Sequence, residues 1–259
     1  MYGRFAEERS KPFFDLLSLV APVPIERAVD LGCGSGELTE QAAQQLLVGS
    51  MTGIDNSANM LAEASPRARS GLEFELGDIG TWSSGGDLDL VLANAALHWV
   101  PDHANVLWRW TAALRPGGQL AVQVPANADH ASHQVIEEVA CQDPFLDALG
   151  GTPPADPVAA NVLAPEAYAE LLYSLGYEQQ HVRLQVYPHV LESTASVVDW
   201  VSGTTLTRFR SRLSPELYDE FVARYRTRLL QVIGDRSPYL YSFKRILCLL
   251  YTSPSPRDS

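Results

Sequence analysis

Cysteine is scarce in this sequence. Its three cysteines, Cys33, Cys141 and Cys248, lie far apart, and none belongs to a CxxC pair. Disulfide frameworks and structural zinc sites depend on closely spaced cysteines. The sequence therefore predicts no disulfide framework and no metal site, and we expect reduced, packed thiols.

The sequence also lacks long apolar runs. No stretch approaches the roughly 20 apolar residues that a membrane helix needs, and the first residues, MYGRFAEERSKPFF, lack the apolar centre of a signal peptide. We therefore expect a cytoplasmic, monomeric protein that does not bind membranes. Of its 259 residues 46% are hydrophobic, which is enough for a large domain core.

Basic residues are few and unevenly distributed. The net charge of -12 at pH 7 argues against nonspecific binding of nucleic acid, because neutralising phosphates requires a basic surface. Residues 1–200 hold 9 Lys or Arg against 26 Asp or Glu, whereas residues 201–247 hold 9 against 4. One late segment is therefore basic on an acidic protein.

Short apolar runs alternate with segments of helix length over the first two thirds of the chain. This pattern is typical of a parallel sheet covered by helices on both faces. The expected strands are residues 27–31, 51–55, 72–76, 88–93, 119–124 and 181–187. The expected helices are residues 10–20, 36–47, 57–64, 103–114 (ending in a turn, RPGG), 133–140 and 165–175. The sequence thus predicts an α/β fold with a doubly wound sheet.

A helical insertion is expected over residues 196–233. Its second half carries an apolar stripe at helical spacing, made of Leu217, Phe221, Tyr225, Leu229 and Val232. Arg224 and Arg228 lie beside this stripe, four residues apart.

A glycine-rich loop follows the first expected strand in VDLGCGSGELT, residues 29–39. Such a loop lets a ligand approach bare backbone and points amide groups at it from a helix N-terminus. Rossmann dehydrogenases use G-x-G-x-x-G here, whereas this chain has G-x-G-x-G with a carboxylate two residues earlier. That carboxylate suits S-adenosylmethionine, which has no phosphate and carries an ammonium and a sulfonium. The candidate cofactor ligands are Asp30, Gly32, Gly34, Ser35 and Gly36.

Polar residues also stand at the ends of the next strands. Asp55 ends the second strand, where a carboxylate can accept hydrogen bonds from ribose hydroxyls. Asp78 ends the third strand and can accept from an adenine amine, while Asn94 and Ala95 follow the fourth. Together with the first strand, which leads into the glycine-rich loop, four successive strand ends carry polar groups at the carboxyl edge of the sheet, where open α/β sheets bind ligands.

Residues 28–125 resemble the class I S-adenosylmethionine-dependent methyltransferases. The motifs that carry the resemblance are VDLGCGSGELT, GIDNSANML, LGDIGTW, DLVLANAALHWVPD and LRPGGQLAVQVP. The resemblance implies a Rossmann-like sheet of about seven strands. It also implies that Asn94 and Ala95 lie beside the methionine part of the cofactor, with further cofactor contacts from Asn56, Met60 and Ile79.

A narrower resemblance covers nearly the whole chain. The segments YGRFAEERSKPFFDLL, ANAALHWVPDH, VQVPANADHASH, VVDWVSGTTLTRFRSRL, FVARYRTRLL and SFKRIL are similar to the trans-aconitate 2-methyltransferases. Members of that family esterify a carboxylate of trans-aconitate, a small tricarboxylate. Such a substrate needs cations, and the basic segment 201–247 offers guanidinium groups that match carboxylates.

The resemblance implies an acceptor site lined by several polar and aromatic residues. The expected substrate ligands are Arg9, His98, Trp99, Arg208, Tyr225 and Arg245. A carboxylate is already ionised at pH 7, so no general base is required, and catalysis rests on alignment and exclusion of water. We expect His98 and Trp99 to position the acceptor at the floor of the pocket; simple packing is the alternative for this pair.

Other functions remain open from the sequence alone. The chain could methylate another acidic acceptor, such as a carboxylate on an acyl carrier. It could also be a noncatalytic binding module on the same fold, although the retained polar residues disfavour this. An NAD-dependent dehydrogenase is a more distant alternative.

The expected organisation follows from these patterns and resemblances. Residues 1–25 form a helical segment over the site, 26–190 the S-adenosylmethionine-binding core, 191–240 a helical substrate cap, and 241–251 the last strand. The end, CLLYTSPSPRDS, departs from the family pattern and looks like translated sequencing adapter. We therefore expect residues 248–259 to be non-native, although their apolar start could still pair on the sheet. We also expect the start to be clipped, since the match begins almost at Tyr2.

Overall fold

The computed structural model describes residues 6–177 and 179–251, and for residues 6–9 it describes the backbone alone. The chain divides into two compact units. The helical unit comprises residues 1–8, 126–160 and 186–244, and the sheet unit comprises residues 9–125, 161–185 and 245–259. Each unit is described separately below.

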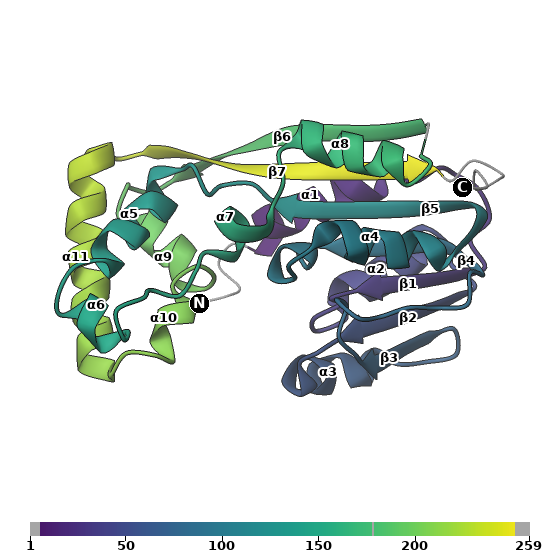
Figure 1. Ribbon diagram of the computed structural model, residues 1–259, viewed down its shortest axis with the longest axis horizontal. Coiled ribbons are helices and arrows are strands. Elements are labelled where there is room, and N and C mark those ends of the chain that lie inside the picture. The colour runs from purple at the N-terminus through teal and green to yellow at the C-terminus, as the bar shows by residue number, and fades with distance from the viewer. Residues whose placement is uncertain (1–5, 178, 252–259) are drawn as a thin grey trace. The chain divides into compact units, whose positions relative to one another are not determined.

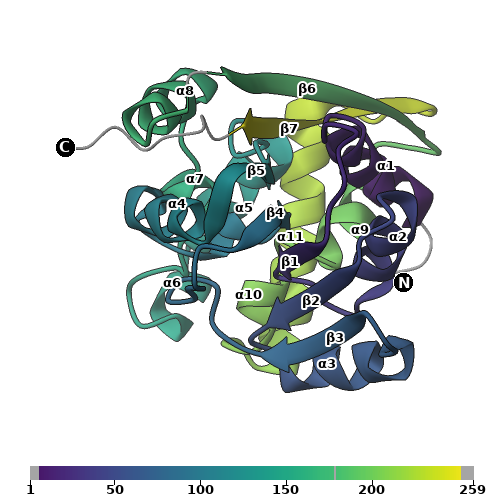
Figure 2. The same ribbon diagram turned by 90° about the vertical axis from the view of Figure 1, so that its right-hand side faces the viewer.

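A seven-stranded sheet with the order β3-β2-β1-β4-β5-β7-β6 organises the sheet unit (Figures 1 and 2). The strands are β1 (Arg27–Leu31), β2 (Ser50–Asp55), β3 (Leu72–Leu76), β4 (Leu88–Asn94), β5 (Leu114–Pro125), β6 (Gln179–Leu191) and β7 (Tyr239–Tyr251). The first five pair in parallel, and β7 runs antiparallel to β5. The predicted doubly wound, mostly parallel sheet is thereby confirmed. Strands β6 and β7 are long enough to contribute to both units.

Helices cover both faces of the sheet in this unit (Figure 2). They are α1 (Ala6–Leu17), α2 (Glu37–Gln45), α3 (Ala58–Ala64), α4 (His103–Ala112) and α8 (Pro165–Ser174), with short 3-10 turns at Ser65–Arg67 and Leu97–Trp99. Phe13, Leu16 and Leu17 of α1 share one core cluster with buried residues of β1, β4, β5 and β7. Strand β4 is buried at every position from Leu88 to Ala93 and is almost entirely apolar, as is usual for parallel strands covered on both faces. Its buried Asp89 accepts hydrogen bonds from the amides of Glu26 and Arg27.

The helical unit packs short helices around one long helix. Its elements are α5 (Ala131–Ala140), α6 (Phe145–Ala148), α7 (Pro157–Asn161, whose last residue belongs to the sheet unit), α9 (Ser196–Ser202), α10 (Thr207–Arg210) and α11 (Pro215–Ile233). Phe221, Tyr225 and Leu229 of the apolar stripe on α11 are buried in the core of this unit, and Leu217 packs against it. Val232 is the exception, because its side chain is 46% exposed near the end of the helix.

Two further expectations need correction. The segment RPGG is not a turn after helix α4, because β5 begins at Leu114 and includes it, with a shift of register opposite β4 between Leu88 and Leu90. The thiol of Cys141 is exposed, contrary to the expectation that all three thiols are packed, whereas Cys33 and Cys248 are buried. All three are free thiols.

Within the described part of the chain, every helix is too short or too polar to cross a membrane.

The end of β7 completes the core of the sheet unit. Leu249 and Leu250 pair with Ala121 and Leu120 of β5, and both are fully buried. The apolar residues after position 247 therefore do pair on the sheet. Whether they are native stays a prediction, and residues 252–259 lie outside the described residues.

Replacing Leu249 by Ala should lower the free energy of unfolding by roughly 2–5 kcal/mol, because it leaves a cavity in a closed core. Leu240 lies on the same strand but is 64% exposed, so Leu240→Ala is the matched control and should change stability by less than about 0.5 kcal/mol. Chemical denaturation of both variants measures the difference. Equal stabilities would contradict the place of β7 in the core.

Candidate functional site

A cavity of about 500 Å³ opens in the sheet unit at the carboxyl ends of the parallel strands. It is lined by Gly32, Asp55, Asn56, Asp78, Ile79, Ala95, Ala96, Trp99 and Val100. These residues come from the segments that follow β1, β2, β3 and β4, because parallel strands in one sheet end at the same edge. The site is therefore built where the sequence motifs place it.

The glycine-rich loop has a backbone that only glycine adopts without strain. Gly32 has φ +85°, and a Cβ there would stand 2.2 Å from the Cβ of Ala96, so a side chain cannot fit. Gly34 has φ +55° but faces open space, since no described atom lies within 4 Å of the place that a Cβ would take. The loop thus presents bare backbone toward an open volume.

Asp55 joins the end of β2 to the glycine loop. Its Oδ2 accepts a hydrogen bond from the amide of Gly34 at 2.9 Å, and its Oδ1 accepts from the amide of Ser57 at 2.9 Å. Ser57 in turn caps α3, because its hydroxyl accepts from the amide of Met60 at 3.3 Å. One carboxylate therefore fixes the loop, the strand end and the start of the next helix.

Asp30 is a buried carboxylate beneath the loop. It is 3% exposed, and its Oδ2 accepts a hydrogen bond from the hydroxyl of Thr39 at 2.6 Å. Burial raises the pKa of Asp30 to about 6, with the hydrogen bond from Thr39 opposing and the charge of Asp55 adding to the rise. A cationic ligand beside this group would favour its ionised form.

The end of β3 forms a tight turn around Asp78. Its Oδ1 accepts from the amide of Gly80 at 2.8 Å, and its carbonyl accepts from the amide of Trp82 at 2.9 Å. The carbonyl of Ile79 accepts from the indole of Trp110 in α4 at 3.1 Å. These bonds hold Asp78 and Ile79 at the cavity wall.

Asn94 and Ala95 follow the buried strand β4. Ala95 has φ +52°, which is unusual for a residue other than glycine, and its amide donates to the carbonyl of Gln123 in β5 at 2.9 Å. The Oδ1 atom of Asn94 is buried without a hydrogen-bond partner among the described residues. This strand end thus combines an unusual backbone conformation with a buried acceptor that has no partner among the described residues.

His98 and Trp99 occupy different environments. Their rings lie 4.7 Å apart in the short turn Leu97–Trp99, but His98 is 7% exposed whereas Trp99 is 60% exposed and lines the cavity. The His98 carbonyl accepts a hydrogen bond from Asn161 at 2.9 Å. Trp99 is thus open to a ligand, and His98 is packed beneath it.

The cavity brings together about half of the predicted cofactor ligands. Those that line it are Gly32, Asp55, Asn56, Asp78, Ile79 and Ala95, and those that do not are Asp30, Gly34, Ser35, Gly36, Met60 and Asn94. The sequence interpretation missed Ala96 and Val100, which line the same cavity. Both flank the His-Trp pair in NAALHWVPD, so their position next to predicted ligands was the available signal.

Arg208 belongs to a buried charged cluster in the helical unit. Its Nη2 pairs with the carboxylate of Glu137, and its Nη1 lies 3.8 Å from Oδ1 of Asp156, whose other oxygen accepts from His133 at 2.8 Å. Burial opposes the charge of Asp156, yet His133, Arg208 and the amide of Val158 together keep its pKa below the usual range. Two guanidinium nitrogens of Arg208, Nε and Nη1, have no hydrogen-bond partner in the part of the chain that the structure describes.

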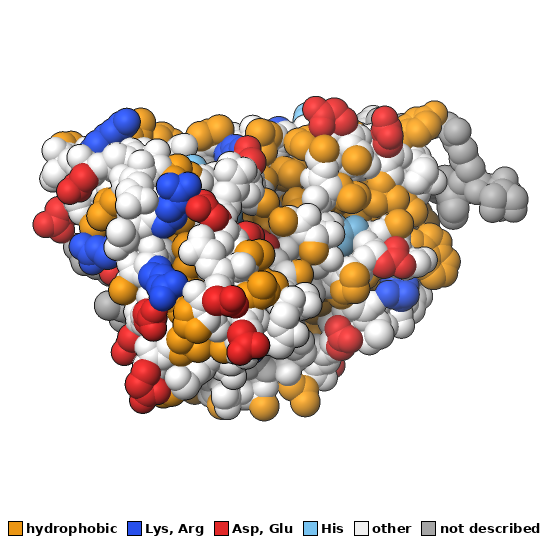
Figure 3. Space-filling model, turned by 60° about the vertical axis from the view of Figure 1, so that its left-hand side comes forward, with side chains coloured by type: hydrophobic (Ala, Val, Ile, Leu, Met, Phe, Trp, Pro, Cys, Tyr) orange, Lys and Arg blue, Asp and Glu red, His pale blue; other side chains and the backbone are white. Residues whose placement is uncertain are grey.

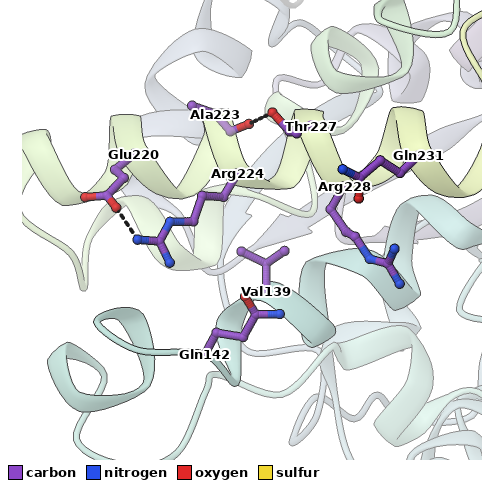
Figure 4. Close-up of a pocket in the computed structure, with 8 residues that line it drawn as sticks. All are labelled: Val139, Gln142, Glu220, Ala223, Arg224, Thr227, Arg228 and Gln231. Atoms are coloured by element: carbon purple, nitrogen blue, oxygen red, sulfur yellow. Dashed lines mark hydrogen bonds and ion pairs between the residues drawn. The ribbon is translucent and has the colours of Figure 1, made fainter.

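Arg224 and Arg228, two other cations of the basic segment, form ion pairs within the helical unit. A groove of about 360 Å³ between α5 and α11 contains Arg224 and Arg228 (Figure 4). Arg224 pairs with Glu220 at 2.6 Å, and Arg228 pairs with Glu138 at 2.8 Å. Figure 3 shows the same alternation of blue basic and red acidic side chains on a wider face. The groove therefore offers little uncompensated positive charge.

The remaining predicted acceptor ligands have separate surroundings. Tyr225 is fully buried in the core of the helical unit, and its hydroxyl donates to the carbonyl of Ser132 at 3.1 Å, so a ligand in this structure does not reach it. Arg245 lies in β7 opposite Pro125 in the sheet unit. Arg9 lies in α1, and its side chain is outside the described residues.

The sheet order β3-β2-β1-β4-β5-β7-β6, with β7 antiparallel to β5, is that of the class I methyltransferase fold. Solved structures support the fold: a phosphoethanolamine N-methyltransferase 2 from Haemonchus contortus has a TM-score of 0.58 at 17% identity, with 93% of this chain and 52% of that chain covered. The YcgJ protein of Bacillus subtilis has a TM-score of 0.61 at 12% identity, with 96% and 100% covered. These neighbours show that the chain has the class I methyltransferase fold.

Sequence relatives define the family more closely. A family model described as a methyltransferase domain matches residues 24–160. The trans-aconitate 2-methyltransferase of Deinococcus radiodurans is 42% identical over 248 residues, with 95% of this chain and 94% of that protein covered. The protein of the same name from Mycobacterium tuberculosis is 36% identical, with 92% and 87% covered. The chain belongs to the trans-aconitate 2-methyltransferase family.

Replacing Asp55 by Ala should weaken cofactor binding about tenfold or more, because it removes a charged acceptor that also fixes the loop amide of Gly34. Titration calorimetry with S-adenosylhomocysteine measures the affinity. Circular dichroism should show an unchanged fold, since Asp55 lies at a strand end on the cavity wall. An unchanged affinity would contradict the role of Asp55 in the site.

The affinity for S-adenosylhomocysteine should fall about tenfold between pH 7 and pH 5. With a pKa of about 6, Asp30 is mostly ionised at pH 7 and mostly protonated at pH 5, and only the ionised form attracts the ammonium of the ligand. Calorimetry at both pH values tests this. The Asp30→Asn variant should bind S-adenosylhomocysteine more weakly than the wild type at pH 7, and its affinity should change less between pH 7 and pH 5. If the wild-type affinity is the same at both pH values, Asp30 does not bind the ammonium group.

Proposed function

We propose that this protein transfers a methyl group from S-adenosylmethionine to a carboxylate of trans-aconitate and forms a monomethyl ester. The support is the similarity to two trans-aconitate 2-methyltransferases at 42% and 36% identity over more than nine tenths of this chain. The cavity at the carboxyl edge is the observation that carries the cofactor part of the proposal. A cytoplasmic location and a monomeric state stay predictions.

The residues of the sheet unit fit S-adenosylmethionine. The open space beside Gly34 leaves room for a ligand against the loop backbone. The carboxylate of Asp30 and the orphaned Oδ1 of Asn94 are acceptors suited to an ammonium group. Asp55 and Asp78 stand at the cavity wall, where the ribose hydroxyls and the adenine amine need acceptors. When bound, the cofactor supplies an activated methyl group on a sulfonium.

The protein has no proton to move in this reaction. Trans-aconitate is ionised at neutral pH because free carboxyl groups titrate near pH 4, so its oxygen is already nucleophilic. The side chains around the cavity have to align this oxygen with the methyl carbon and keep water away. Trp99, exposed at the cavity, is the candidate for covering the reacting groups, and His98 supports it from beneath.

Arginine side chains are the candidates for holding the three carboxylates. In the helical unit, Arg208 is nearly buried and has two nitrogens without a hydrogen-bond partner among the described residues, although Glu137 already offsets part of its charge. In the sheet unit, Arg245 lies on β7 at the carboxyl edge. Arg208 and Arg245 each stay a predicted acceptor ligand within their own unit, and Tyr225 is assigned to the core rather than to the substrate.

Incubation with labelled S-adenosylmethionine and separate acceptors tests the function. We expect methyl transfer to trans-aconitate to exceed transfer to cis-aconitate, citrate and isocitrate by at least tenfold. Trans-aconitate holds its three carboxylates on a planar trans alkene, and each of the other acceptors arranges its carboxylates differently. The product is identified as a monomethyl ester by mass spectrometry. Equal or absent transfer across the panel would defeat the assignment, whereas transfer to an acyl carrier alone would favour a carrier-bound carboxylate.

A further inference from the structure

Three polar side chains lie side by side on one face of the sheet unit. Asn94 of β4 is the register partner of Gln123 of β5, and Arg245 of β7 is the register partner of Pro125, two residues after Gln123. Side chains alternate between faces along a strand. Leu92, Ala121 and Leu247, each two residues from one of the three, share one core cluster. Asn94, Gln123 and Arg245 therefore extend this face toward the carboxyl edge.

Gln123 is a buried amide whose donor is unused. Its side chain is 1% exposed, and its Nε2 has no hydrogen-bond partner within the described ranges 6–177 and 179–251. The Oδ1 of neighbouring Asn94 is also buried and equally without a partner there. Buried polar groups normally have a hydrogen-bond partner, so each of these two calls for a partner that the described residues do not supply.

Gln119 is a buried glutamine on the same strand whose side-chain amide does have hydrogen-bond partners. It lies four residues earlier on the same face of β5 and is also 1% exposed. Its Oε1 accepts from the amide of Ala21 at 2.7 Å, and its Nε2 donates to the carbonyl of Ala21 at 3.5 Å. The difference between the two residues is their distance from the carboxyl edge, where the site lies.

We propose that Gln123 is a specificity-determining substrate residue, whose Nε2 donates a hydrogen bond to the carboxylate that receives the methyl group. This inference rests on the proposed function, because it takes the acceptor to be a polycarboxylate. Asn94, with its unused oxygen acceptor, faces the ammonium of the cofactor. Arg245, one register step farther out, contacts a carboxylate that does not react.

The chemistry explains why an amide suits the reacting carboxylate better than a cation. A carboxylate oxygen forms a bond to the methyl carbon while the carbon-sulfur bond breaks, and the electron pair of that bond stays on sulfur. An anion and a cation thus become a neutral ester and a neutral thioether, without transfer of a proton. A guanidinium would stabilise the negative charge most in the ground state, where it is largest. Such ground-state stabilisation raises the barrier to methyl transfer. A neutral amide donor orients the oxygen while stabilising the ground state less.

Gln123→Met tests the proposal, with Gln119→Met as the matched control. We expect Gln123→Met to lower kcat/KM for trans-aconitate about tenfold to a hundredfold, as for loss of a hydrogen bond to a charged group. Its affinity for S-adenosylhomocysteine should stay within twofold, and its thermal midpoint should stay equal or rise, because an unpaired buried amide is replaced by an apolar group. Gln119→Met should lower the thermal midpoint and leave kcat/KM within twofold.

A second acceptor separates the roles of the amide and the guanidinium. Trans-glutaconate lacks one of the three carboxylates of trans-aconitate. Gln123→Met should reduce kcat/KM by a similar factor for both acceptors, because the reacting carboxylate is common to them. Arg245→Gln should reduce kcat/KM more for trans-aconitate than for trans-glutaconate.

The possible outcomes are distinct. Wild-type kcat/KM in Gln123→Met would overturn the inference while leaving the proposed function intact. A tenfold loss of S-adenosylhomocysteine affinity at unchanged KM for the acceptor would also overturn it, because Gln123 would then contact the cofactor. Absence of methyl transfer by the wild-type protein would overturn the proposed function and this inference together.

Discussion

The register of the parallel strands is the constraint on which the site depends. Hydrogen bonding aligns β1 with β2 and β4, and β4 with β5, so that their last residues reach the same edge of the sheet. A slip of one residue in any strand would turn its terminal polar group to the opposite face. The continuous burial of β4 fixes that register, because its apolar residues fit both covering layers. Packing energy in the middle of the sheet thus determines the positions of polar groups at its edge.

Charge compensation explains how a basic segment fits on an acidic chain. In the helical unit, Arg208, Arg224 and Arg228 each pair with a glutamate, and two of these glutamates belong to α5. The exposed pairs contribute little to stability because water screens them. The cluster around Arg208 differs, because the side chains of Arg208 and Asp156 are largely removed from water, although Glu137 is 40% exposed. Of these three arginines, Arg208 is the one that keeps unused donor nitrogens away from solvent, as far as the described residues extend.

Much of the fold could be predicted from the sequence, since periodicity and turn residues are local. The bounds of β1 and β3 agree with the expected ranges, and the glycine loop lies where its motif indicates. Ion pairing could not be predicted, because Glu137 and Arg208 are 71 residues apart and only tertiary packing joins them. For the same reason Tyr225 looked available as a ligand, although its hydroxyl is bonded to Ser132 within the core. Gln123 lay unnoticed in an apolar strand because one sequence cannot show that an amide lacks a partner.

The carboxylates around the cofactor cavity have a consequence for turnover. Asp55 and Asp78 line the cavity of the sheet unit, and Asp30 is buried beneath the glycine-rich loop. Such a cluster attracts a ligand in proportion to its positive charge. Methyl transfer converts a sulfonium into a neutral thioether, so the used ligand leaves the site with one unit less positive charge than the fresh one brought. Under the proposed function, the same acidic residues therefore attract the spent product less strongly than the methyl donor.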